Sequence, residues 1–172
     1  MKGAHSDGRE ETVAAAHKLS AGLLMYRVRN GQLEVFLGHP GGPMFARKDD
    51  GHWTIPKGEP NDDEDLLLAA QREFQEETGI RPVGPFHPLG SIKQKGGKVV
   101  HAWACPEAPG SDGPIQSNHF EMQWPPGSGQ LRSFPEMDRA QFFPLVVART
   151  KLKDTQVPLV DRLEAWEGWR KS

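Results

Sequence analysis

Three glutamates follow an arginine at a spacing that could support metal chemistry: Arg72 directly precedes Glu73, with Glu76 and Glu77 three and four residues further on. A helix turns about 100° per residue, so positions i, i+3 and i+4 share one face and these carboxylates would converge and repel one another. Arg72 can relieve only part of that repulsion. Oxygen ligands at this density suit Mg²⁺ or Mn²⁺, which carboxylates commonly hold together with substrate phosphates. The spacing therefore predicts a divalent metal site, against the alternative of a solvated acidic helix face.

The neighbouring residues predict the helix that would position these glutamates. Asn61 and Glu64 stand at the spacing of a capping box, and the acidic residues between them favour a helix N-terminus. We therefore expect the helix to begin near Asp62. Residues 66–78 contain no glycine or proline, and Gly79 tolerates the left-handed conformation in which many helices end.

A second stripe on this helix, together with several apolar segments, predicts the rest of the fold. Leu67, Ala70 and Phe74 lie beside the glutamate face at positions i, i+3 and i+7, and we expect them to pack on a sheet. An Asn-Gly pair beginning at Asn30 indicates a hairpin, and Pro158 marks the first turn of a last helix. These elements predict an α/β fold with a mixed sheet between helices. The expected strands are residues 19–28, 33–38, 53–55, 86–92, 98–105 and 120–124.

The segment from Gly58 to Ile80 resembles the Nudix box, the signature of the Nudix hydrolases. Gly58 is followed after five residues by Glu64, and after seven more by the run Arg72-Glu73-Phe74-Gln75-Glu76-Glu77-Thr78-Gly79-Ile80. Seven fixed identities in register arise by chance roughly once per billion start points, at about 1 in 20 per position. Segments 19–24, 53–58 and 124–129 are similar to a bacterial branch usually described as predicted NTP pyrophosphohydrolases. The resemblance implies an α/β/α sandwich in which the box forms a loop-helix-loop motif.

The resemblance also implies a reaction, the hydrolysis of a nucleoside diphosphate linked to another group X. Water attack at phosphorus requires neutralised phosphate charge, an oriented nucleophile and stabilisation of the leaving oxygen. Mg²⁺, or Mn²⁺ in its place, can meet all three requirements. By the resemblance, Glu73, Glu76 and Glu77 bind the metal together with the carbonyl of Gly58, and Arg72 orients Glu73 through an ion pair.

The general base stays open, because Nudix enzymes place it either inside the box or on a later loop. Glu73 is the candidate inside the box. Glu121 and Glu136, on either side of the turn at 125–129, are the candidates outside it, and each has the alternative of a plain surface carboxylate. Glu64 is interpreted either as the capping-box partner of Asn61 or as a residue with an outer role at the metal site.

Three residues are predicted to bind substrate: Lys57, Trp53 and Lys95. Lys57 directly precedes the box, where its ammonium group could contact a phosphate. Lys95, with Lys93 and Lys98, surrounds a Gly-Gly turn that could grip a polyphosphate, although a solvated turn is the alternative. Trp53 could stack on a base, against the alternative of a core residue.

The substrate class is narrowed by what the sequence lacks. A single cysteine excludes the four-cysteine zinc site of NADH pyrophosphatases. Residues 95–98 lack the proline typical of ADP-ribose pyrophosphatases and the tyrosine typical of dinucleoside tetraphosphatases, although segment 53–58 resembles several dinucleoside-polyphosphate hydrolases. A nucleoside triphosphate or a dinucleoside polyphosphate is therefore the expected substrate. The alternative is a catalytically silent Nudix domain that acts as a nucleotide sensor or binding module, but no box carboxylate is missing.

The chain as a whole fits a small enzyme. Its 172 residues suffice for one domain, which we place at 19–172 after a flexible leader at 1–18. The net charge of −2 predicts no broad cationic surface for nucleic acid or anionic lipid. No secretion signal is visible, and no apolar run approaches the roughly 18 residues of a membrane helix, so we expect a cytoplasmic protein, either monomer or homodimer.

Overall fold

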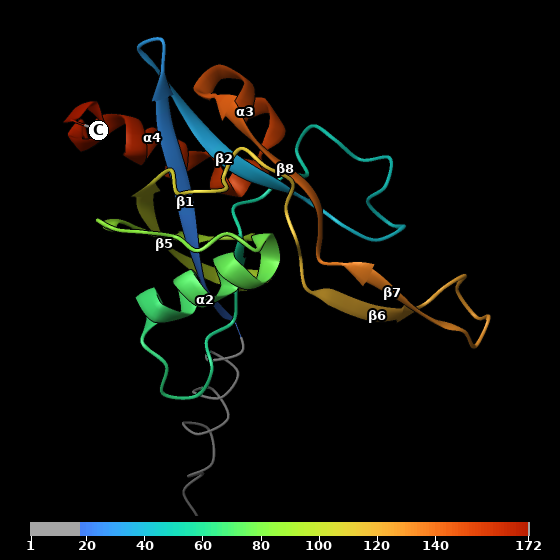
Figure 1. Cartoon of the computed structure of the whole chain (residues 1–172). Coiled ribbons are helices and arrows are strands. Elements are labelled where there is room, and N and C mark those ends of the chain that lie inside the picture. Colours follow the sequence, from blue (N-terminus) through green and yellow to red (C-terminus); the bar gives the residue numbers. More distant parts are fainter. Residues whose placement is uncertain (1–17, 172) are drawn as a thin grey trace, which may run out of the picture.

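A mixed β-sheet forms the centre of the computed structural model, which describes residues 18–171 (Figure 1). Its strands are β1 (Leu19–Arg29), β2 (Gln32–Pro40), β3 (Lys57–Gly58), β4 (His87–Lys93), β5 (Val99–Pro106) and β8 (Met137–Pro144). The strand order is β4-β5-β1-β2-β8, and β3 pairs with β1. β1 runs parallel to β5, whereas the other pairings in this sheet are antiparallel. The predicted α/β fold class is confirmed.

β1 changes partner along one edge, and this change brings the start of the box into the sheet. The second half of β1 pairs with β2. Its first half pairs with β3, where Ala21 lies opposite Gly58. Gly22 permits this close approach, because a Cβ added there would lie 2.7 Å from the Cβ of Lys57. Lys57 and Gly58 are therefore fixed by main-chain pairing.

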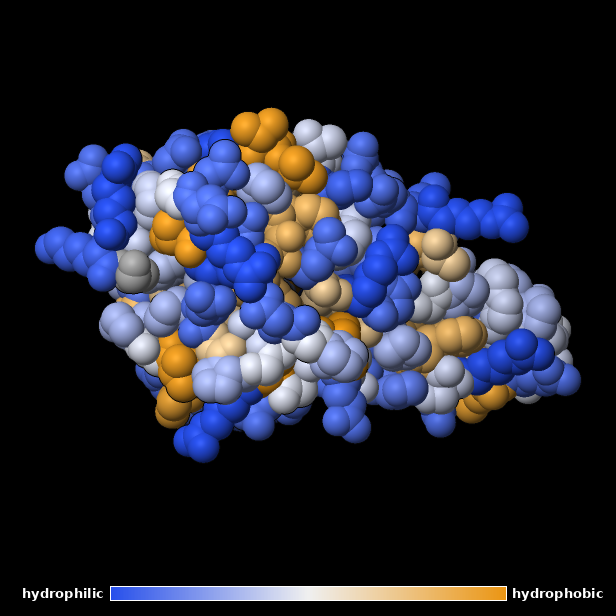
Figure 2. Space-filling model, turned by 45° about the horizontal axis from the view of Figure 1, so that its top comes forward, coloured by the Kyte–Doolittle hydropathy of each residue, from blue (hydrophilic) through white to orange (hydrophobic). Residues whose placement is uncertain are grey.

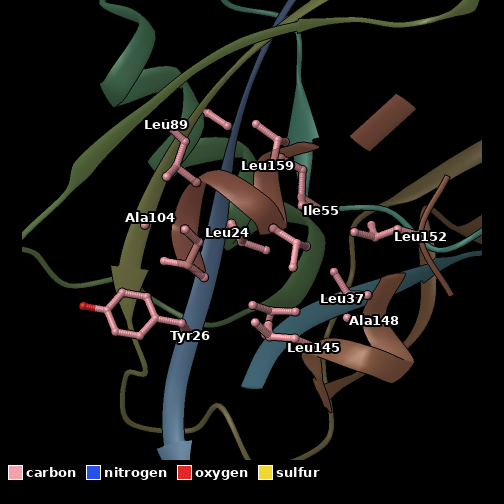
Figure 3. Close-up of a cluster of buried hydrophobic side chains, with 14 of the residues drawn as sticks. Leu24, Tyr26, Leu37, Ile55, Leu89, Ala104, Leu145, Ala148, Leu152 and Leu159 are labelled. Carbon is pink, nitrogen blue, oxygen red and sulfur yellow. The ribbon is translucent and has the colours of Figure 1, made fainter. Parts of the chain in front are cut away.

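Helices cover both faces of the sheet and give the α/β/α sandwich. They are α2 (Leu66–Thr78), α3 (Leu145–Lys151) and α4 (Val157–Ala165), with 3₁₀ turns η1 (Lys95–Gly97), η2 (Asp154–Gln156) and η3 (Gly168–Lys171). Successive side chains of a strand point to opposite faces. Leu23 and Met25 accordingly join a buried cluster with Phe74 of α2. Leu24 and Tyr26 join the larger cluster on the other face, which α3 and α4 complete (Figure 3).

The position where α2 begins differs from the prediction, whereas its end agrees. The helix begins at Leu66 rather than near Asp62. Asp63 has a φ of 60°, a left-handed conformation that cannot continue into a helix, and the side chain of Asp65 caps the N-terminus instead. Gly79 ends the helix with a φ of 75°, as predicted.

A two-stranded arm extends away from the sheet beside α2 (Figure 1). It consists of β6 (His119–Gln123) and β7 (Leu131–Pro135), and the predicted turn at 125–129 lies between them. At its base, the backbone N–H of Asn118 donates to the carbonyl of Glu76 (2.8 Å), so the arm is attached to the box helix. Several elements had no counterpart among the predictions, because their exposed and charged residues show no clear apolar period: β7, β8 and α3.

Other expectations have mixed outcomes. The hairpin at Asn30, the strand pair around η1 and the last helix, α4, with Pro158 in its first turn, are confirmed. The expected strand at 53–55 forms only isolated bridges at Trp53 and Thr54. The predicted leader lies outside the described residues, apart from its last position. Within residues 18–171, no helix is long and apolar enough to span a membrane.

Apolar side chains on the surface are scattered rather than gathered. The face in Figure 2 shows small hydrophobic patches among hydrophilic side chains. The large apolar residues exposed in the described part of the chain are Met44, Leu68, Val83, Leu131, Val146 and Val147. The choice between monomer and homodimer stays a prediction.

Candidate active site

Arg72 is the centre of an ion-pair network on α2. Its Nε and Nη2 donate to the two carboxylate oxygens of Glu64, each at 2.9 Å. Its Nη1 donates to Glu73 at 2.9 Å and to Glu76 at 3.1 Å, and its Nη2 also reaches the carbonyl of Glu59. The ion pair predicted between Arg72 and Glu73 is therefore present. Glu64 also accepts the backbone N–H of Asn61 at 3.0 Å, in the loop before α2, so it is bound both to this loop and, through two hydrogen bonds, to Arg72.

Glu73 lies directly against the backbone of Gly58. A Cβ placed on Gly58 would come within 2.0 Å of the Glu73 carboxyl carbon, so this site accepts no larger residue without moving the carboxylate. Burial raises the pKa of Glu73, while the charge of Arg72 opposes that rise and the charge of Glu76 adds to it. The glycine at the start of the box therefore leaves the space that the Glu73 carboxylate occupies.

Glu77 and Lys57 form a half-buried pair on the other side of this glycine. The backbone N–H of Lys57 donates to Oε2 of Glu77 at 3.2 Å. The pKa of Glu77 is raised to about 8, mainly by burial, with smaller contributions from the charges of Glu73 and Glu136, while the charge of Lys57 opposes the rise. Burial likewise lowers the pKa of Lys57 to about 8. Burial therefore disfavours the charged form of both groups, and such a perturbed pair marks a candidate functional site.

The two outside carboxylates differ in their relation to the box. Glu136, between β7 and β8, is close enough for its charge to raise the pKa of Glu77. Its backbone N–H donates to the carbonyl of Asn118 at the base of the arm. Glu121 lies on the exposed side of β6 opposite Ser133, and no hydrogen bond or ion pair joins it to the box within the described chain. Of these two candidates, the fold brings Glu136 rather than Glu121 to the box.

The other two predicted substrate contacts have different outcomes. Trp53 is only 3% exposed, and its ring packs edge-on against Phe143 at 4.9 Å. Its Nε1 donates to Asp49, so Trp53 is a core residue and its surface is closed to a stacked base. Lys95 is 86% exposed and pairs only weakly with Asp154, at 3.9 Å, so its contact with substrate stays a prediction. At the same hairpin it is Lys98, rather than Lys95, whose charge acts on Lys57.

Comparison with known proteins identifies the family of this site. The family model of the NUDIX domain matches residues 16–163. The chain belongs to the Nudix family. It is a Nudix hydrolase, an enzyme class that acts on phosphoanhydride bonds, and the geometry above is that of its box.

Solved Nudix structures share this fold over most of their length. An Ap4A hydrolase from C. elegans, in a binary complex, is 25% identical with a TM-score of 0.60, covering 86% of this chain and 96% of that one. The NUDIX domain of Shewanella oneidensis NrtR, complexed with ADP ribose, is 16% identical with a TM-score of 0.59, covering 86% of each chain. The MutT protein of Methanosarcina mazei Go1 is 20% identical with a TM-score of 0.54, covering 87% of this chain and 94% of that one. The last two likenesses show the fold alone.

The Nudix carboxylates suit a hard divalent cation, although they are not assembled around one point. Among residues 18–171, no three His, Cys, Asp or Glu side chains are grouped tightly enough to enclose a metal as they stand. Arg72 hydrogen-bonds to Glu73 and Glu76, and the charge of Glu73 raises the pKa of Glu77 near Gly58. A half-buried carboxylate whose pKa is raised by burial and by a neighbouring carboxylate is stabilised in its ionised form by a cation beside it. The donor set therefore fits the predicted Mg²⁺ or Mn²⁺ ligands.

Metal binding to this Nudix site is expected to release a proton at neutral pH. Because the pKa of Glu77 is raised to about 8, its carboxyl is largely protonated at pH 7 and must ionise to bind Mn²⁺. Titration calorimetry at pH 7, in two buffers of different ionisation enthalpy, should give close to one proton released per ion. At pH 9 the release should approach zero. Equal heats in both buffers at pH 7 would contradict the prediction.

Proposed function

We propose that the protein is a Mg²⁺-dependent pyrophosphohydrolase that cleaves a phosphoanhydride bond of a nucleoside triphosphate or dinucleoside polyphosphate. The observation that supports this most strongly is the juxtaposition of two half-buried carboxylates, Glu73 and Glu77, with the ammonium of Lys57 around Gly58. Such a site offers oxygen ligands to a cation and a positive charge to a phosphate at the same place.

The proposed mechanism assigns each residue a physical task. Glu73, Glu76 and Glu77, with the Gly58 carbonyl, would hold the metal, which when bound supplies charge neutralisation and a water of lowered pKa. Arg72 fixes Glu73 and Glu76 by hydrogen bonds, which limits their rotation. These restraints would keep the carboxylates aligned while charge develops on the leaving oxygen.

The scheme also requires a positive charge at the substrate and a group that accepts a proton. Lys57, held by β3 pairing, would neutralise a phosphate oxygen beside the scissile bond. Glu73 is the general-base candidate inside the box, and its pKa is raised by burial, which increases its basicity. Glu136 is the candidate outside the box that the fold favours over Glu121.

The nucleotide class is supported by similarity and by charge. The likeness to the C. elegans Ap4A hydrolase extends over nearly the whole of that chain. Around Lys57 the described residues also include other lysines whose charges lower its pKa, which suits a substrate with many phosphate charges. The alternative, a silent nucleotide-binding module, is less well supported because every carboxylate of the box is present.

The deciding experiment is product identification by chromatography and mass spectrometry. Wild type and Glu76→Gln would be incubated with Mg²⁺ and a panel of nucleoside triphosphates, dinucleoside polyphosphates and nucleotide sugars. Turnover that disappears with chelator, and falls by about 10²-fold or more in Glu76→Gln, is the expected result. Tight nucleotide binding without any product would instead favour the binding module.

A further inference from the structure

Three lysines from distant parts of the chain converge beside the box. Lys57 lies on β3, Lys98 immediately before β5, and Lys153 between α3 and η2. The charges of Lys98 and Lys153 both act on Lys57, and the charge of Lys98 acts on Lys153. Nothing near Lys153 in the sequence indicates a phosphate-binding role, so only the fold discloses this cluster.

A buried glutamine holds the three lysine-bearing segments together. Gln156 is fully buried, and its Oε1 accepts the backbone N–H of Ile55, two residues before Lys57. Its Nε2 donates to Thr54 at 2.9 Å and lies 3.5 Å from the amide oxygen of Gln94, at the hairpin that carries Lys98. Its backbone N–H donates to the carbonyl of Lys153. The convergence of the lysines is therefore built into the core rather than left to flexible side chains.

Lys153 has an environment that suits an anion. Its side chain is half-buried, and no ion pair satisfies its ammonium group among residues 18–171. Burial and then the charge of Lys98 lower its pKa, and an anion beside the ammonium group would offset both effects. Beside it is a pocket of about 290 Å³. The pocket is lined by Gly51, Gln94, Lys95, Lys153, Asp154 and Thr155.

Two other lysines of this region, Lys95 and Lys98, form only long ion pairs with neighbouring carboxylates. Asp154 faces Lys95 at 3.9 Å, and Glu59 faces Lys98 at 3.7 Å. Both contacts are near the outer limit of an ion pair and both carboxylates are exposed, so a phosphate could displace them at little cost. Lys57, Lys98 and Lys153 therefore form a row of positive charges, the cationic path, which leads from the box to the pocket beside Lys153.

We propose that Lys153 and the pocket beside it form a subsite for the distal phosphates of a polyphosphate chain, which makes Lys153 a specificity-determining residue for substrates with four or more phosphates. This inference rests on the proposed function, because it takes the scissile bond to lie at the box. A substrate with only two phosphates would be spanned by the box and Lys57, and would leave Lys153 without a partner. A longer chain would extend along the path and gain a charge-assisted hydrogen bond.

The test compares Lys153→Gln with a matched control, Lys171→Gln, an exposed lysine in η3. Binding of inorganic tripolyphosphate, measured by calorimetry without metal, should weaken about tenfold in Lys153→Gln and stay within twofold of wild type in the control. With Mg²⁺, kcat/KM for a dinucleoside tetraphosphate should fall about tenfold through KM, while kcat/KM for ADP-ribose stays within twofold. Lys153→Arg should restore most of both losses, because it keeps the charge.

Several outcomes separate the possibilities. Unchanged tripolyphosphate affinity in Lys153→Gln would overturn the subsite. Equal losses on the tetraphosphate and on ADP-ribose would also overturn it, since Lys153 would then support the box rather than choose chain length. If wild type hydrolyses no substrate but Lys153→Gln still weakens tripolyphosphate binding, the proposed function fails and the anion subsite stands.

Discussion

Glu77→Gln is expected to lower kcat by about 10²- to 10⁴-fold and at the same time to stabilise the metal-free protein. Activity falls because an amide cannot supply the anionic metal ligand. Stability rises because Glu77 is half-buried and its pKa is raised to about 8. In the absence of a cation, the ionised carboxylate therefore destabilises the folded protein. An amide of similar shape keeps an oxygen to accept the backbone N–H of Lys57.

The sign of the stability change depends on pH. A carboxyl whose folded-state pKa exceeds its unfolded value binds more protons when folded, so this group costs stability as pH rises from about 4.5 to about 8. Denaturant unfolding should therefore show no difference between Glu77→Gln and wild type at pH 4. At pH 9 the variant should be more stable by about 1–3 kcal/mol. This range is smaller than the full shift of the Glu77 pKa would give, because the partly exposed carboxylate is screened by solvent.

Glu107→Gln is the matched control for this prediction, because Glu107 is exposed and lies beyond the far end of β5. It should leave both kcat and the free energy of unfolding unchanged. Saturating Mg²⁺ should stabilise wild type and remove most of the advantage of Glu77→Gln, since the cation neutralises the same charge. A variant at position 77 that is inactive and also less stable at pH 9 would contradict the assignment of Glu77 as an unneutralised carboxylate.

The box could be predicted from sequence because its chemistry is local. Glu73, Glu76 and Glu77 share a face as a consequence of helical geometry alone, and Arg72 reaches Glu73 and Glu76 within one turn of the helix. The predicted start of α2 near Asp62 was wrong for a local reason, because a capping-box spacing is compatible with more than one backbone conformation. Asp63 adopts a left-handed conformation, while the hydrogen bond between Asn61 and Glu64 is still formed.

The surroundings of the box could not be predicted in the same way, because they depend on long-range packing. The indole ring of Trp53 is of a type that stacks on bases, and only the tertiary contact with Phe143 shows that the ring is enclosed. Lys153 and Gln156 join the site through contacts with residues about a hundred positions earlier. Periodicity and local spacing carry no information about such contacts. The distinction between Glu121 and Glu136 likewise depends on how the arm leaves the sheet.

Gly58→Ala is expected to damage both catalysis and folding, because the added methyl group has no room. Its Cβ would lie 2.0 Å from the carboxyl carbon of Glu73 and 2.1 Å from Oε2, so the carboxylate must move. That movement breaks the 2.9 Å hydrogen bond from Arg72 and displaces a proposed metal ligand. We expect kcat to fall by about 10²-fold or more, and stability by about 1–3 kcal/mol.

Gly113→Ala provides the control, since its Cβ would meet only ordinary contacts, the nearest at 3.6 Å. A double-mutant cycle with Glu73→Ala locates the clash, because shortening residue 73 removes the group that the methyl displaces. The stability cost of Gly58→Ala should then largely disappear in the Glu73→Ala background, while activity stays low in both. If the full cost persists there, the damage arises from the pairing of β3 with β1, and Glu73 does not depend on the space at Gly58 for its position.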